Sequence, residues 1–208
     1  MDDNLNSENF SFNTPRKSTA KKAVEFVWEM IKVGLISLAI ILPVRYFLIQ
    51  PFYVKGASME PNFYDHEYLI IDEITYRLSE PKRGDIVVFR YPLNPKQYFI
   101  KRVIGLPGER VKIENNQVFV GKIGGKLEPL TENYLSPEAQ TSLPIKGYGD
   151  VSLGENEYFV LGDNRDESLD SRIFGPVMRD FIIGRTWLRG WPFNRITVFN
   201  APDYPINK

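Results

Sequence analysis

The sequence predicts a mainly β protein, with an antiparallel, barrel-like sheet domain that follows one N-terminal transmembrane helix. Three observations predict this fold class. An uncharged apolar run occupies residues 33–44, short runs rich in β-branched and aromatic residues follow Pro51, and the pair Asn115-Asn116 separates two of these runs. Because Asn tolerates positive φ, such a pair is typical of a hairpin turn. The 208 residues suffice for one domain of roughly 150 residues plus an appendage.

Residues 1–48 divide into a polar part and an apolar part. Residues 1–22 end in a basic stretch and are interpreted as a flexible cytoplasmic tail. Residues 23–48 are predicted to form a single transmembrane helix. The alternatives are an amphipathic core helix and a cleaved signal sequence, but no small-x-small cleavage site follows the run. The basic cluster predicts a single-pass protein of the cell membrane, with its N-terminus cytoplasmic and residues 49–208 extracytoplasmic.

Residues 49–208 contain short strands separated by turn signals. The runs are rich in β-branched and aromatic residues, which favour strands. They lie at 68–71, 85–90, 98–104, 110–114, 117–120, 158–161, 182–188 and 195–199. Residues 121–154 carry Gly, Pro, Ser and Lys with little periodicity, so we expect an insertion or small subdomain at about 112–154.

The charge balance and the composition exclude several classes of protein. Lys and Arg number 26, as do Asp and Glu, so nothing indicates a nucleic-acid partner, which usually requires a basic surface. Cysteine is absent and His66 is the single histidine, which excludes disulfides, thiolate zinc sites and multi-histidine metal sites. We therefore expect neither a metal nor a cofactor.

Lys101 is the first candidate for chemistry. Alternation along its strand puts Phe99, Lys101 and Val103 on one face, which is otherwise apolar and is predicted to be buried. Burial disfavours the ammonium form and lowers the pKa of a lysine, which is the condition for a lysine to act as a base near neutrality. The alternative is an edge-strand lysine whose amine reaches water.

Two other segments could contribute to a site. Ser58 lies in the sequence KGASMEP, where small residues leave space for a substrate backbone, although a serine in such a segment is usually a turn former. Residues 162–175 contain three aspartates, two arginines and two serines, which favours an ordered network of ion pairs. A calcium loop is the alternative for this segment, but its aspartates lack the alternate-residue spacing of an EF-hand.

Taken together, these segments resemble the type I signal peptidases, the bacterial leader peptidase family of Ser-Lys dyad serine proteases. Four stretches stand in the family's order: GASMEP at 56–61, GDIVVF at 84–89, YFIKRVIGLPG at 98–108 and GDNRDESLDSR at 162–172. The resemblance spans about residues 30–190 and leaves the insertion uncovered. It implies a membrane-bound serine endopeptidase that removes N-terminal signal peptides from exported preproteins after small residues.

The resemblance also implies a role for each matched residue. Ser58 would attack the scissile carbonyl after losing its proton to neutral Lys101, and Ser168 would hydrogen-bond this lysine and orient it. The backbone N–H of Ser58 would donate to the oxyanion. Ion pairs that support the active site would come from Arg102, Asp163, Asp170 and Arg172.

The chain departs from the family's pattern near the serine. Gly56 stands where some members have a serine whose hydroxyl is the second oxyanion donor, so here another group must donate, and the backbone of Gly56 is one candidate. Asn62 stands where a threonine is common. Pockets that accept alanine are expected from Phe52, Val54, Gly56, Met59, Phe63 and Ile100, with ordinary core packing as the alternative for each.

The expected partners are the signal peptides of exported preproteins and the lipid bilayer, and the protein is expected to be a monomer. Phe47, Phe52 and Tyr53 are expected to contact the lipid surface. His66 lies in a polar stretch and is expected to be a surface residue. Two rival functions are a self-cleaving Ser-Lys protease like the SOS repressors, which would require an N-terminal DNA-binding domain, and a membrane-tethered β-barrel binding module without activity.

Overall fold

The computed structural model of this chain describes residues 19–43, 50–201 and 204. The chain divides into two compact units, residues 1–43 and 44–208. The predicted tail falls almost entirely on residues 1–18, outside the described residues. The predicted boundary between residues 48 and 49 lies outside them as well, so it stays a prediction.

The first unit contains the helix α1 (Thr19–Pro43), which has 25 residues. Within the described part of the chain, no helix is sufficiently long and apolar to traverse a membrane. The transmembrane helix predicted over residues 23–48 is therefore not found. Residues 44–48 of the predicted span lie outside the described residues.

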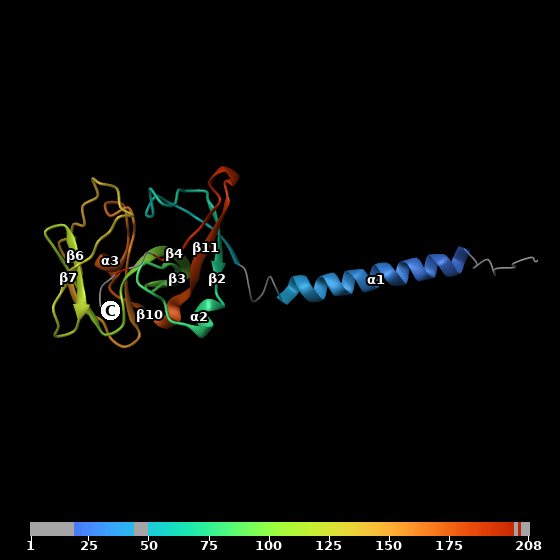
Figure 1. Cartoon of the computed structure of the whole chain (residues 1–208), viewed down its shortest axis with the longest axis horizontal. Coiled ribbons are helices and arrows are strands. Elements are labelled where there is room, and N and C mark those ends of the chain that lie inside the picture. The colour runs from blue at the N-terminus through green and yellow to red at the C-terminus, as the bar shows by residue number, and fades with distance from the viewer. Residues whose placement is uncertain (1–18, 44–49, 202–203, 205–208) are drawn as a thin grey trace, which may run out of the picture. The chain divides into compact units, whose positions relative to one another are not determined.

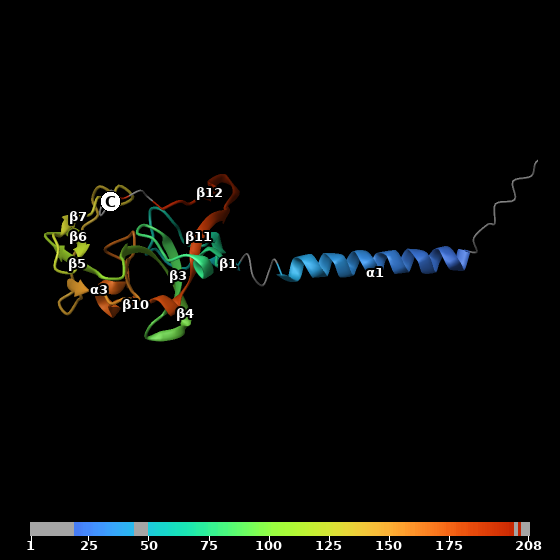
Figure 2. The same cartoon turned by 60° about the horizontal axis from the view of Figure 1, so that its bottom comes forward.

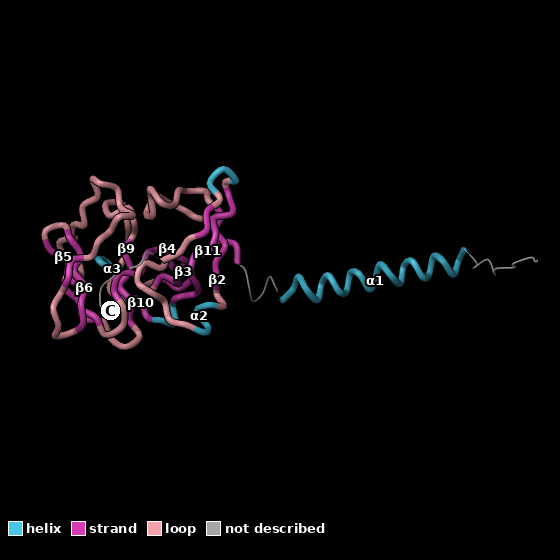
Figure 3. The backbone as a smooth tube through the Cα atoms, viewed as in Figure 1, coloured by secondary structure: helices cyan, strands magenta, loops and turns pink. Residues whose placement is uncertain are grey.

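Twelve strands occur in the described part of the second unit, and all of their pairings are antiparallel (Figure 1). This confirms the predicted mainly β fold class. The strands are β1 (Gln50–Tyr53), β2 (Tyr68–Asp72), β3 (Ile86–Tyr91), β4 (Asn94–Gly105), β5 (Glu109–Glu114), β6 (Gln117–Lys122), β7 (Glu128–Pro129), β8 (Asp150–Ser152), β9 (Glu157–Leu161), β10 (Val177–Met178), β11 (Ile182–Trp191) and β12 (Thr197–Val198). In the described part of this unit, helix is confined to short segments between strands (Figure 3), namely α2 (Thr75–Leu78), α3 (Ser171–Phe174), η2 (Arg179–Phe181) and η3 (Phe193–Arg195).

The larger sheet has the order β1-β2-β11-β3-β4-β9-β10, and β12 pairs with β11. Strand β4 lies between β3 and β9, with Val87 opposite Lys101 and Leu161 opposite Arg102. Both faces of β4 are buried from Lys101 to Gly105. A strand in this position holds its side chains rigidly, because both of its edges are paired.

The smaller sheet has the order β7-β6-β5-β8 and lies at the end of the unit away from β1, β2 and β11 (Figure 2). Asn115 and Asn116 have φ of 50° and 61° between β5 and β6, as the predicted hairpin turn requires. The aperiodic segment from 121 to 154 contributes β7 and β8, which pair with β6 and β5. A Cβ at Gly105, where the chain passes from the larger sheet toward the smaller one, would collide with Val111 and Leu153.

Candidate active site

Ser58 lies in the segment that joins β1 to β2. Two backbone hydrogen bonds close this segment at its base, from Val54 N to Glu67 O at 2.8 Å and from His66 N to Val54 O at 3.1 Å. Farther out, the N–H of Asn164 donates to the carbonyl oxygen of Ser58 at 3.1 Å. Ser58 is thus held both by its own loop and by the segment that follows β9.

Lys101 reaches Ser58 from the middle of β4. Its Nζ donates to Ser58 Oγ at 2.7 Å and to the carbonyl oxygen of Ile100 at 2.8 Å. The lysine is 3% exposed, so the prediction of a buried lysine is confirmed and the alternative of an edge-strand lysine in water is wrong. Residues 43 positions apart in the sequence therefore form one hydroxyl–amine pair.

The surroundings of Lys101 favour its neutral form. Burial lowers the pKa of the amine from 10.5 to about 8, although the carboxylates of Asp170 and Asp163 act in the opposite direction. The ring of Phe99 lies 5.5 Å from Nζ and supplies part of the apolar surrounding. An amine with this pKa can accept a proton near neutral pH, because a useful fraction of it is already deprotonated.

Ser168 and Gly162 pack beside this pair. The hydroxyl of Ser168 is buried and has no hydrogen-bond partner among the described residues, so the predicted bond to Lys101 is not made in this structure. A Cβ at Gly162 would collide with the Ser168 side chain and with the carbonyl oxygen of Ser58. The close approach of these segments therefore requires glycine at position 162.

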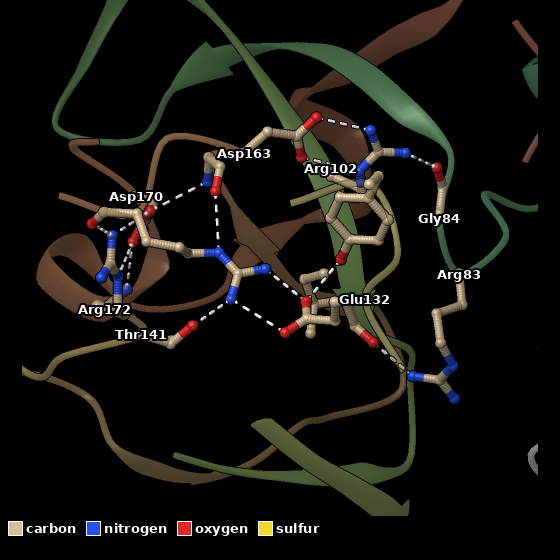
Figure 4. Close-up of polar contacts among 12 residues, drawn as sticks. Arg83, Gly84, Arg102, Glu132, Thr141, Asp163, Asp170 and Arg172 are labelled. Atoms are coloured by element: carbon tan, nitrogen blue, oxygen red, sulfur yellow. Dashed lines mark hydrogen bonds and ion pairs between the residues drawn. The ribbon is translucent and has the colours of Figure 1, made fainter. Parts of the chain in front are cut away.

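Two buried ion pairs fix the loop between β9 and α3 (Figure 4). Arg102 donates to both carboxylate oxygens of Asp163, at 2.8 and 2.6 Å. Arg172 binds Asp170 in the same two-pronged manner, with both distances 2.9 Å. Bidentate pairs of this kind impose geometry as well as attraction. All four residues were singled out from the sequence, and the structure brings them together in these two pairs.

Sequence reasoning missed a third buried pair, Arg165 with Glu132. It noted Asn62 but assigned it no role; its amide donates to Asp163 Oδ2 and to Tyr134 O, both at 2.8 Å. Arg165 lies inside the motif GDNRDESLDSR at 162–172, but its partner Glu132 comes from the aperiodic segment between β7 and β8. Nothing in the local sequence there marks Glu132 as buried.

The backbone of Gly56 is engaged elsewhere. Its N–H donates to Asp65 Oδ1 at 3.0 Å, so it is not free to serve as the second oxyanion donor in this structure. The same carboxylate contacts His66 Nδ1 through its other oxygen at 2.9 Å, and the His66 side chain is 75% exposed. The expectation of a surface histidine agrees with this exposure, and no triad can form around it.

A cavity of about 270 Å³ opens beside Ser58 and Lys101. Of the six residues predicted to bind substrate, four line it: Phe52, Val54, Gly56 and Ile100. Met59 and Phe63 do not line it, and both are almost fully buried in a core cluster that also contains Val54. Sequence reasoning missed the apolar lining from other strands and from the loop before α3, namely Leu69, Val88, Tyr98 and Leu169.

A comparison with protein families gives the site its context. The model of the family described as "Signal peptidase, peptidase S26" matches residues 27–191. The chain belongs to the signal peptidase family, peptidase S26. This match confirms the resemblance drawn from the sequence motifs and the predicted enzyme class, a serine-protease hydrolase of the signal peptidase I kind.

Curated members of the signal peptidase family resemble the chain over most of its length. The "Probable signal peptidase I-2" of Synechocystis sp. is 38% identical over 192 residues, which cover 88% of this chain and 84% of that protein. The "Signal peptidase I" of Leptolyngbya laminosa is 37% identical, with coverages of 87% and 88%. The "Signal peptidase I T" of Bacillus subtilis is 34% identical, with coverages of 88% and 95%.

Proposed function

We propose that this chain removes signal peptides from exported preproteins after small residues, with Ser58 as the nucleophile and Lys101 as the general base. The observation that carries the proposal is the 2.7 Å contact between Lys101 Nζ and Ser58 Oγ at the wall of an open cavity. A serine hydroxyl needs an adjacent base to become a nucleophile. Burial, which lowers the pKa of Lys101 to about 8, supplies one.

In the first half of the reaction, Ser58 Oγ bonds to the scissile carbonyl carbon and its proton passes to Lys101 Nζ. The oxyanion that forms accepts a hydrogen bond from the N–H of Ser58, which donates to no other described residue. The carbon–nitrogen bond then breaks as the Lys101 ammonium gives its proton to the leaving amine. The mature protein departs, and the signal peptide stays on Ser58 as an ester.

In the second half, a water molecule loses its proton to neutral Lys101 and attacks the ester carbon. The ester bond breaks, Lys101 returns the proton to Ser58 Oγ, and the signal peptide leaves with a new carboxyl terminus. Ser168 is proposed to orient Lys101 during these transfers. Its buried hydroxyl, which lacks a partner among the described residues, supports this role.

The cavity wall supports a preference for small side chains before the cut. Phe52, Val54 and Ile100 present apolar surface to it, and about 270 Å³ must hold both the substrate backbone and its side chains. Alanine fits such a space with little loss of contact. A branched or aromatic side chain would have to displace these three side chains, which pack against the core.

Incubation of the full chain with a purified preprotein tests the proposal. We expect one cut, at the end of the signal peptide, identified by N-terminal sequencing of the product. Replacing the alanine before the cut by phenylalanine should lower kcat/KM by at least about 100-fold, since the pocket would have to open to admit the ring. An intact preprotein after long incubation would instead indicate the binding module without activity.

We also propose that the protein works as a monomer at the cell membrane, with residues 49–208 on the extracytoplasmic side where exported preproteins emerge. Between Val33 and Leu42 the apolar side chains lie on every side of α1, and a helix that is apolar all round requires an apolar surrounding. We expect the full chain to float with phospholipid vesicles in a density gradient. Recovery in the bottom fractions, with the chain folded and soluble, would contradict a lipid partner.

A further inference from the structure

Glu132 lies between β7 and β8, in the segment to which the sequence assigned no role. Its side chain is 9% exposed although it carries a carboxylate. The carboxylate contacts both terminal nitrogens of Arg165, with Nη1 to Oε2 at 3.1 Å. It also accepts a hydrogen bond from Tyr134 Oη at 2.6 Å. Figure 4 shows Glu132 and Thr141 converging on the same guanidinium group.

Arg165 depends on this carboxylate. Its side chain has no exposed surface, and a charge so deeply buried is costly unless it is paired and hydrogen-bonded. Glu132 is the carboxylate in direct contact with it, and Thr141 Oγ1 accepts a further hydrogen bond. Removing the charge of Glu132 therefore leaves a buried cation without its partner, which favours a shift of the loop that carries it.

The loop that carries Arg165 also holds the Ser58 side of the reacting pair. Arg165 Nε donates to the carbonyl oxygen of Gly162 at 3.0 Å. Gly162 packs directly against the carbonyl oxygen of Ser58, and the neighbouring Asn164 donates to that same oxygen at 3.1 Å. A displacement at Arg165 thus reaches Ser58 through only two contacts.

We propose that Glu132 is a positioning residue for the Ser58–Lys101 pair, acting through Arg165 on the loop from Gly162 to Ser168. Glu132 does not line the cavity, so it takes no part in the chemistry itself. Tyr134 strengthens the same connection, because its ring lies 3.9 Å beneath the guanidinium of Arg102, the partner of Asp163. The segment between β7 and β8 therefore holds the loop from Gly162 to Ser168 in position through the contacts of Glu132 and Tyr134. This inference rests on the proposed function.

The chain supplies a matched control for this proposal. Arg83 and Glu109 form another buried pair, with side chains 6% and 8% exposed and a distance of 2.5 Å between Arg83 Nη2 and Glu109 Oε1. Glu109 also accepts a hydrogen bond from Leu106 N, and the side-chain hydrogen bonds of this pair go to Ile104 O, to Leu106 N and to each other, none to the described loop from Gly162 to Ser168. Glu109→Gln thus breaks an equally buried pair away from Ser58.

The experiment compares Glu132→Gln, Glu132→Asp and Glu109→Gln in the full chain, with kcat and KM for preprotein cleavage measured at a temperature where every variant is folded. We expect Glu132→Gln to lower kcat by about 10–100-fold, the scale of a sub-ångström misplacement of reacting groups. Its KM should change less than about threefold, because most of the cavity wall lies on β1, on the segment that follows it and on β4. Glu132→Asp should recover most of kcat, and Glu109→Gln should lower Tm similarly but keep kcat.

Equal kcat values for Glu132→Gln and Glu109→Gln would overturn the proposal and leave Glu132 a purely stabilising residue. If Glu132→Gln fails to fold, Tyr134→Phe replaces it, since it removes one hydrogen bond to Glu132 and keeps the ring on Arg102. For Tyr134→Phe we expect kcat to fall by about threefold to tenfold, the effect of losing one buried hydrogen bond. An unchanged kcat in this variant overturns the proposal.

If the unmutated chain cuts no preprotein, the proposed function itself fails. If the unmutated chain cuts preprotein and Glu132→Gln keeps full kcat, only the positioning role proposed for Glu132 fails.

Discussion

We expect Ser58→Ala to lower kcat for preprotein cleavage by about 10⁶-fold, the scale on which a serine protease loses activity with its nucleophile. The substitution removes one hydroxyl from a loop whose backbone is held by Val54 and Asn164. The Lys101 amine keeps its bond to the carbonyl oxygen of Ile100. Stability should therefore change by less than about 1 kcal/mol, and the variant should bind the preprotein without cutting it.

His66→Ala is the control for Ser58→Ala. His66 is the single histidine of the chain. Its exposed side chain contacts the carboxylate of Asp65 and lies edge-on to the ring of Tyr53, with 5.5 Å between the ring centroids. Full activity in His66→Ala together with none in Ser58→Ala excludes a serine–histidine mechanism. Ser168→Ala should have a smaller effect than Ser58→Ala. If the Ser168 hydroxyl orients Lys101, kcat should fall by about 10²–10⁴-fold. Turnover by Ser58→Ala at more than about one-hundredth of the normal rate would contradict the assignment of the nucleophile.

The second large effect concerns the protonation of Lys101. Only the neutral amine accepts the Ser58 proton, so kcat/KM should rise with pH and level off above the pKa. With a pKa of about 8, about one molecule in ten is active at pH 7, whereas an ordinary lysine would give about one in several thousand. We expect the rising limb of the pH profile to have its midpoint near pH 8. A rate that still climbs at pH 10 would mean that Lys101 is solvated.

Lys101→Arg should be inactive over the whole pH range, because a guanidinium does not lose its proton there. Lys112→Arg is the matched control. Lys112 lies on β5, paired with Glu114 at the surface, and the same substitution there should leave kcat/KM and its pH midpoint unchanged. Activity in Lys101→Arg comparable to that of the control would remove the lysine from the chemistry.

The sequence predicted the parts of the site whose signals are local. Lys101 lies between Phe99 and Val103 on an apolar strand, and period-two alternation along this strand correctly predicted its burial. Asn115-Asn116 likewise specifies its turn through backbone preference alone. The charged loop from residue 162 to 172 was recognised because its closely spaced aspartates and arginines can be read from the sequence alone.

What the sequence did not predict depends on contacts between distant segments. Met59 and Phe63 were expected to line a substrate pocket, with ordinary core packing as the alternative, and both side chains lie almost fully buried in the core. Glu132 is buried against Arg165, which lies 33 residues away in the sequence. No periodicity marks β7 or β8, which are two or three residues long and form because β5 and β6 offer edges to pair with.

The position of β11 in the larger sheet has a consequence for when the enzyme becomes competent during synthesis. Residues 182–191 lie between β2, whose neighbour β1 leads to Ser58, and β3, whose neighbour β4 carries Lys101. A ribosome has therefore made the proposed nucleophile and the proposed base long before it makes the strand that joins their two halves of the sheet. Until β11 pairs on both sides, no strand pairing joins β2 to β3. We therefore expect proteolytic activity to begin only after β11 has been made and has paired with both neighbours.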